Sequence, residues 1–238
     1  MEYKYTGIIL NKVEVGETDR IYTIYTLEAG KIRVLAKGVR KPNAKLAGNL
    51  EPITLAEIFL AKSRGMGKIT GVINLENFSE IKSNLEALQK ISQTFRLFNK
   101  IIVEQEQDEE IFRNLEDFLR SLNALAKKEE GGEKIDLLVI GFSLKLLSSM
   151  GYHLEVERCV HCEDRLQPEN NYFSASKGGV LCLNCYKFEN KRIQISPDSI
   201  KVIRIILKNK LDGLVRLQLS QQEINKLKII IQEALNWI

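Results

Sequence analysis

The stretch CVHCEDRLQPENNYFSASKGGVLCLNC, residues 159–185, contains all four cysteines of this 238-residue chain. They form two pairs, Cys159 with Cys162 and Cys182 with Cys185, separated by nineteen residues. Two thiolates three positions apart on a tight turn can share one ion, and a second pair after about 15 to 20 residues completes a tetrahedron. Because four sulfur ligands leave no vertex for water or substrate, the spacing predicts one structural zinc ion.

Other interpretations of the cysteines stay open: two disulfides, a redox pair, or buried thiols that bind nothing. Disulfides are disfavoured, because the N-terminus MEYKYTGIIL has no basic segment leading into an apolar one and does not indicate export. His161, between the first two cysteines, could replace one of them as a ligand. The residues between the pairs predict a loop and then a short hairpin turning at Gly178 and Gly179. The whole zinc knuckle is expected over residues 152–190.

The composition is that of an ordinary globular protein, with 44% apolar and 28% charged residues. No apolar run is long enough to cross a bilayer, so we expect a cytoplasmic protein. The net charge is only +4, but it is unevenly distributed. Residues 1–80 and 191–238 carry more basic than acidic residues, whereas the middle of the chain is acidic. This distribution indicates contact with a polyanion at the two ends of the chain.

Residues 1–79 are expected to form one domain of five short strands. A polar turn region, VEVGETDR, follows the first strand, and a longer loop precedes the fourth. The expected strands cover residues 3–10, 20–27, 31–37, 53–60 and 68–75. Within the third, Ile32, Val34 and Ala36 alternate with cationic positions, which predicts one packed and one cationic face. This pattern suits a small barrel of the oligonucleotide-binding (OB) kind, although a five-stranded SH3-like barrel would produce a similar sequence.

Residues 80–238 are expected to form an all-helical domain into which the zinc knuckle is inserted. Apolar positions recur with a helical period over 85–102, 111–122 and 135–150, and the last of these is apolar nearly all round, which predicts a buried central helix. Ser196 and Pro197 predict a helix start, and a capping box from Ser220 to Glu223 predicts another. The predicted fold class is therefore α+β and multidomain.

A basic run with no acidic residue covers the third strand and the loop that follows it. Its cations are Lys31, Arg33, Lys37, Arg40, Lys41 and Lys45. A phosphate backbone requires such a surface, because each contact displaces condensed counterions. The alternative is a solvated strand edge protected against aggregation, a common role of lysine.

Two further groups of residues have a functional and a structural interpretation. Tyr3, Tyr5, Tyr22 and Tyr25 could stack on nucleobases, or could simply pack within strands. Lys201, Arg204 and Lys208 share one side of a predicted helix and could bind an acidic partner, or form its solvated face. The chain contains no GxSxG sequence, phosphate-binding loop, zinc-hydrolase motif or paired acidic motif, so we expect no enzymatic activity.

Three ordered segments resemble the bacterial RecO family of recombination mediators, over essentially the whole chain. They are GETDRIYTIYTLEAGKIRVLAKGVRK (16–41) with LEP (50–52), SSMGYHLEVERCVHCED (148–164), and GGVLCLNC (178–185). The resemblance implies an N-terminal OB barrel, a helical C-terminal domain with a zinc knuckle, and a non-enzymatic, nucleoid-associated role in recombinational DNA repair. It also implies binding of single- and double-stranded DNA, annealing of complementary strands, contact with the acidic tail of single-strand-binding protein (SSB), and loading of RecA together with RecR.

By the same resemblance, Lys31, Arg33, Lys37, Arg40 and Lys41 are expected DNA contacts, and the four cysteines match the metal positions of the family. The chain departs from the family where we expect a hydroxyl residue, at Asn43 and Ala44. Two other functional classes stay open. One is a protein adaptor whose basic faces bind acidic proteins, and the other is a thiol switch.

Overall fold

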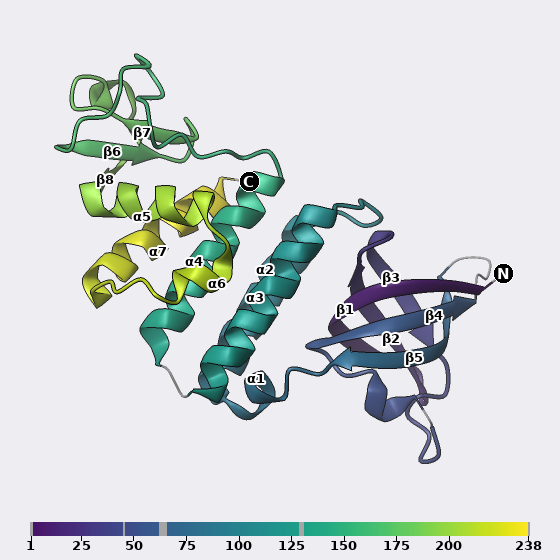
Figure 1. The fold of residues 1–238 in the computed structure, drawn as a ribbon. Coiled ribbons are helices and arrows are strands. Elements are labelled where there is room, and N and C mark those ends of the chain that lie inside the picture. The colour runs from purple at the N-terminus through teal and green to yellow at the C-terminus, as the bar shows by residue number, and fades with distance from the viewer. Residues whose placement is uncertain (1, 45, 62–65, 129–130, 238) are drawn as a thin grey trace. The chain divides into compact units, whose positions relative to one another are not determined.

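The computed structural model describes residues 2–44, 46–61, 66–128 and 131–237, and the chain divides into two compact units, Met1–Glu129 and Glu130–Ile238 (Figure 1). The α+β class expected from the sequence is confirmed, with a five-stranded sheet in the first unit and mostly helices after it. Within the described ranges, no helix is both long and apolar enough to span a membrane.

The first unit contains a closed barrel in the spatial order β1-β2-β3-β5-β4. Its strands are β1 (Glu2–Val15), β2 (Asp19–Thr26), β3 (Gly30–Ala36), β4 (Thr54–Ala61) and β5 (Lys68–Glu76). The first part of β1 pairs with β4, and the second part pairs with β2, so this one long strand connects β4 and β2 in the barrel. The prediction of a turn region from residue 13 was wrong, because β1 continues to Val15 through pairs with β2 as far as Val15 with Asp19.

The alternation predicted for β3 decides which of its side chains lie inside the barrel. Val34 and Ala36 are buried in the barrel core, and the partly buried Ile32 packs against it. Arg33, between them, is exposed. The period of two therefore places apolar side chains inside and turns Arg33 outward.

Within its described residues, the first unit also contains a 3-10 helix, η1 (Ala47–Asn49), and the helices α1 (Ser79–Ser83), α2 (Leu85–Ile101) and α3 (Glu109–Lys127). Asn84 and Asp108 cap α2 and α3 with their side-chain oxygens. The ring of Tyr25, on β2, lies 5.0 Å from that of Phe98 and 6.3 Å from that of Phe112, measured between ring centroids. These contacts join both long helices to the barrel, so the first compact unit ends later than residue 79. The expected division into domains 1–79 and 80–238 stays a prediction.

The second unit is built around α4 (Gly132–Ser149), which contacts α5 (Pro197–Lys208), α6 (Leu211–Leu214) and α7 (Gln221–Asn236). Buried residues occur all round α4, as its sequence predicted. A three-stranded sheet in the order β7-β6-β8 lies between α4 and α5 in the sequence, with β6 (Asn171–Ser174), β7 (Gly179–Leu181) and β8 (Ile193–Ile195). The hairpin of β6 and β7 was predicted, whereas β8 and α6 were not.

Two predicted helix starts in this unit have different outcomes. The Ser196 hydroxyl accepts the Ser199 N–H at 3.0 Å with Pro197 in the first turn, as expected. Ser220 likewise accepts the Glu223 N–H at 3.3 Å. A capping box also requires the Glu223 carboxylate to accept a hydrogen bond from the Ser220 N–H. That part of the prediction was wrong, because the carboxylate instead accepts hydrogen bonds from the hydroxyls of Ser196 and Ser199. Glu223 thereby links the first turns of α5 and α7.

Candidate metal centre and nucleic-acid interface

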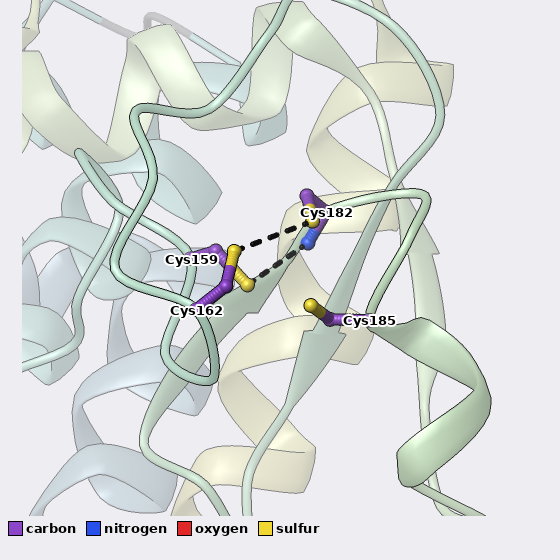
Figure 2. A group of neighbouring side chains, drawn as sticks. All are labelled: Cys159, Cys162, Cys182 and Cys185. Atoms are coloured by element: carbon purple, nitrogen blue, oxygen red, sulfur yellow. Dashed lines mark hydrogen bonds between the residues drawn. The ribbon is translucent and has the colours of Figure 1, made fainter.

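The four cysteines come together in the second unit from two separate turns (Figure 2). Their sulfur atoms all lie within 4.8 Å of one another, and the Sγ atoms of Cys162 and Cys182 are 3.9 Å apart. Cys159 and Cys185 are buried, whereas Cys162 is exposed. No other group of His, Cys, Asp or Glu side chains within the described residues has the spacing of a metal site.

Local hydrogen bonds shape both turns. The Glu163 N–H donates to the Cys159 carbonyl at 2.9 Å, and the Cys159 N–H donates to the Asp164 carbonyl at 2.8 Å. Glu163 has a φ of 63°, so the first turn closes in the left-handed region. In the second turn, the N–H groups of Cys185 and Tyr186 both donate to the Cys182 carbonyl at 3.0 Å. Each cysteine pair therefore lies on a tight, internally bonded turn.

The donor set fits a tetrahedral metal ion. A zinc–sulfur bond of roughly 2.3 Å places the sulfurs of a tetrahedron about 3.8 Å apart, close to the 3.9 Å between Cys162 and Cys182. The four cysteines are free, as a metal site requires. Burial raises the pKa of the Cys159 thiol, but hydrogen bonds from the backbone N–H groups of Cys162, Cys182 and His161 outweigh burial and lower that pKa to about 7. The His161 ring stacks on Phe188, with 4.7 Å between ring centroids, and does not join the cysteine cluster.

Lys31 differs from the other cations of the basic run, because it is only 8% exposed. Its ammonium group donates to the backbone carbonyl of Asn99 at 2.8 Å and to that of Ile102, at the C-terminal end of α2. Burial lowers the pKa of Lys31, and the nearby Glu104 opposes that shift. This geometry corrects the expectation that Lys31 faces solvent as a DNA contact, because its ammonium group is hydrogen-bonded to backbone carbonyls of the first unit.

The other described cations of the run lie on β3 and on the loop that follows it. Arg33, Lys37, Arg40 and Lys41 are all exposed, and Lys45 lies outside the described residues. The loop has a defined shape: Gly38 has a φ of 64°, its N–H donates to the Asp19 carboxylate at 2.7 Å, and the Arg40 N–H donates to the Thr18 carbonyl at 2.9 Å. The loop therefore lies against the turn between β1 and β2.

Carboxylates partly balance these loop cations. The Arg40 guanidinium lies 3.4 Å from the exposed Glu14 carboxylate. Hydrogen bonds from the Gly38 N–H and the Thr18 hydroxyl hold the pKa of Asp19 below its usual value against the opposing effect of burial, and the charges of Lys37 and Lys41 lower it further by smaller amounts. Arg33 has no ion-pair partner within the part of the chain that the structure describes. Among the exposed cations of the run that the structure describes, Arg33 is thus unopposed, whereas Lys37, Arg40 and Lys41 lie close to acids.

The four tyrosines divide into two pairs. Tyr22 and Tyr25 are completely buried, so their rings belong to packed interiors. Tyr3 and Tyr5 are half-buried, and their rings are nearly parallel, at 19° with 6.3 Å between centroids. The sequence could not separate these pairs, because strand periodicity assigns faces without showing what covers them.

The three cations proposed for an acidic partner all have partners within the second unit. Lys201 lies 3.3 Å from Asp198, while Arg204 and Lys208 lie 3.2 Å and 3.1 Å from the Glu157 carboxylate. Arg204 also donates to the Val156 carbonyl at 2.9 Å. Lys208, by hydrogen bonding, and then Arg204 lower the pKa of Glu157. Arg204 therefore holds the chain before the cysteines against α5, whereas Lys201 and Lys208 remain largely exposed.

Comparison with known families and proteins covers both units. The family described as "Recombination protein O N terminal" matches residues 1–78, and "Recombination protein O C terminal" matches residues 82–237. A DNA repair protein RecO of Dehalococcoides mccartyi is 30% identical over 239 aligned residues, covering 100% of this chain and 90% of that protein. Proteins of the same name from Acetivibrio thermocellus and Bacillus pumilus are 31% and 29% identical, over 96% and 86% of this chain and 88% and 77% of theirs.

Proposed function

Because this chain belongs to the recombination protein O family and has a role in DNA repair and recombination, we propose that it is a DNA-binding recombination mediator. In this proposal it binds single- and double-stranded DNA and anneals complementary strands. Together with RecR, it helps to load RecA onto single strands coated by SSB. None of these steps makes or breaks a covalent bond, so the proposed activity is not enzymatic.

The observation that carries the proposal is the exposed basic surface of the barrel, formed by Arg33, Lys37, Arg40 and Lys41. The closed order β1-β2-β3-β5-β4 supports assignment to the OB class. Barrels of that class bind oligonucleotides on the face of strands 2 and 3 and on the neighbouring loops. Arg33 lies on β3, and the loop cations lie beside the turn between β1 and β2. The position of the charges therefore suits the class of barrel.

Phosphate contacts explain how such a surface promotes annealing. Two complementary strands repel each other, and cations on the sugar-phosphate backbone reduce that repulsion while leaving the base edges free to pair. With about four contacts to a single strand, the slope of log affinity against log salt is about −3, or roughly fiftyfold in affinity between 50 and 200 mM salt. The carboxylates Glu14 and Asp19 beside the loop make this an upper bound.

Fluorescence anisotropy with labelled single- and double-stranded DNA, over a range of salt concentrations, tests the proposal. Charge reversal at Arg33, Lys37 and Arg40 together should abolish binding of both DNAs and leave the melting temperature nearly unchanged. The matched control reverses Lys187, Lys191 and Lys210, which are exposed in the second unit and change the net charge equally. Equal loss in both variants would indicate a nonspecific effect of net charge. Weak wild-type binding with a shallow salt slope would favour the adaptor function.

We further propose that Cys159, Cys162, Cys182 and Cys185 hold one structural zinc ion, supported by their spacing and by the four convergent sulfurs. When bound, the ion crosslinks the two turns of a segment with a small apolar cluster of its own. Metal analysis of protein purified without added zinc should give one zinc per chain. Free thiols and no metal would favour a thiol switch.

The acidic tail of SSB remains a proposed partner of Lys201, Arg204 and Lys208. Because Arg204 has a structural role, charge reversal at Lys201 and Lys208 is the cleaner test. That double variant should bind an acidic, phenylalanine-ended peptide less tightly than the wild type, and undiminished binding would move the site elsewhere. A cytoplasmic, nucleoid-associated location also stays a prediction.

A further inference from the structure

A pocket of about 430 Å³ opens at one mouth of the barrel, within the first unit. Residues of β1, β3 and β4 line it, together with Met66, Gly67 and the segment 104–105. The residues that matter for its chemistry are Tyr3, Tyr5, Leu60, Arg33, Glu104 and Gln105. Its volume is in the range of small-molecule sites, about 300 to 1,000 Å³, and barrel mouths are a common place for such sites.

Around the pocket, the described part of the chain shows little pairing between β3 and β5. Among the described residues, β3 and β5 pair at Leu35 with Lys68, and the Leu35 N–H donates to the Gly67 carbonyl at 2.9 Å. The earlier part of β3 is accompanied instead by the segment after α2, through a bridge between Lys31 and Glu104 and a 2.9 Å hydrogen bond from the Gln105 N–H to the Lys31 carbonyl. The pocket is lined by this earlier part of β3, by the segment 104–105, and by residues of β1 and β4.

An aromatic wall lines one side of the pocket. The nearly parallel rings of Tyr3 and Tyr5 come from the part of β1 that pairs with β4 alone. Tyr5 packs against the barrel core, which holds its ring in place. Flat rings of this kind provide stacking surface for any base, because every base has a π-face.

The polar groups of the pocket are chemically complementary to a nucleotide. Arg33 is exposed, and within the described ranges it has no ion-pair partner, so its guanidinium is available for a phosphate. Glu104 and Gln105 offer hydrogen-bonding groups on the rim for the edge of a base.

We infer that this pocket binds one unpaired nucleobase of single-stranded DNA, stacked on Tyr3 and Tyr5, with the adjoining phosphate at Arg33. The inference rests on the proposed DNA-binding function and adds a strand preference to it. Loop cations contact the backbone of either form of DNA, whereas a base inside a duplex is stacked between its neighbours and cannot enter. The pocket therefore favours single-stranded over double-stranded DNA.

A cycle that combines one protein variant with one DNA change tests the inference. The protein change is Tyr3→Leu, which retains an apolar side chain and removes the ring. The DNA change replaces the bases of a short single strand by abasic sites. Affinities are measured by anisotropy for the full-length wild type and variant, with Tyr3→Phe as the conservative variant. Tyr152→Leu, at an exposed tyrosine of the second unit, is the matched control.

Tyr3→Leu should weaken binding of normal single-stranded DNA by about five- to a hundredfold. Binding of abasic and double-stranded DNA should change less than about twofold, as should all binding by Tyr3→Phe and Tyr152→Leu. Because the wild type alone should also bind the abasic strand more weakly, the test does not depend on the stability of the variant. Equal affinity of the wild type for normal and abasic strands would overturn the inference.

Other outcomes separate this inference from the proposed function. Strong wild-type binding of DNA that Tyr3→Leu leaves unchanged would reject the base pocket and retain the backbone site. No binding of any DNA by the wild type would reject both. If an acidic, aromatic-ended peptide bound and Tyr3→Leu weakened it while DNA binding stayed intact, the pocket would belong to a protein partner, and the inference would be wrong.

Discussion

Replacing Lys31 by methionine should destabilise the first unit without weakening its binding to DNA. The Lys31 ammonium is buried and donates to the carbonyls of Asn99 and Ile102, where α2 has no further N–H groups to offer them. Methionine fills a similar volume but donates no hydrogen bond. Lys31 belongs to the basic run by sequence, but in the structure it caps the C-terminal end of α2. The substitution therefore removes the two hydrogen bonds of that cap.

The expected loss follows from these two hydrogen bonds. Hydrogen bonds from a charged donor contribute roughly 1.5 to 3 kcal/mol each, and methionine avoids the desolvation of a buried ammonium, which offsets part of the loss. We expect a net decrease of about 2 kcal/mol in the free energy of unfolding. A phosphate contact at Lys31 would instead contribute about 0.7 to the salt slope for single-stranded DNA.

Urea denaturation followed by circular dichroism measures the first quantity, and anisotropy titrations against salt measure the second. Arg33→Met is the matched variant, since Arg33 is two residues away on the same strand but exposed. It should leave stability nearly unchanged, weaken DNA binding and lower the slope by about 0.7. If Lys31→Met kept full stability and reduced the slope as Arg33→Met does, the structural role assigned to Lys31 would be refuted.

Three further substitutions test other parts of the fold. Glu223→Gln should lower stability at pH 7 by roughly 1 to 3 kcal/mol. Hydrogen bonds from Ser196 and Ser199 outweigh burial and hold the pKa of Glu223 below its usual 4.5, so the difference should shrink below pH 4.5 and disappear as pH falls through the lowered pKa. A difference in stability that did not depend on pH would contradict this reasoning. Cys185→Ser should abolish zinc binding and lower stability by roughly 3 kcal/mol or more, whereas the exposed neighbour change Leu183→Ser should do neither. Gly30→Ala should be more destabilising than Gly16→Ala by about 1 kcal/mol or more. Both glycines have positive φ, but only at Gly30 would a Cβ collide with the Glu106 carbonyl. Equal melting temperatures of the two variants would show that residues 104–107 do not pack against Gly30.

Several features could be predicted from the sequence because they depend on neighbours in the chain. The spacing within each cysteine pair determines a turn, and the structure brings the four sulfurs together. The alternation in β3 follows from strand geometry, so Val34 is buried and Arg33 is exposed. The cap at Ser196 needs only the N–H of Ser199, three residues later. In each case, the physical cause lies within a few residues or in a simple periodicity.

The tertiary structure decided what each face and each charge is used for. Lys31 has the same sequence context as Arg33, yet it is buried because the end of α2 lies over it. Glu223 turns from its own helix to the hydroxyls of α5, and Arg204 reaches the Val156 carbonyl. Periodicity shows which side of a strand or helix a residue occupies, but only long-range packing shows whether water, a carbonyl or an acid meets it there.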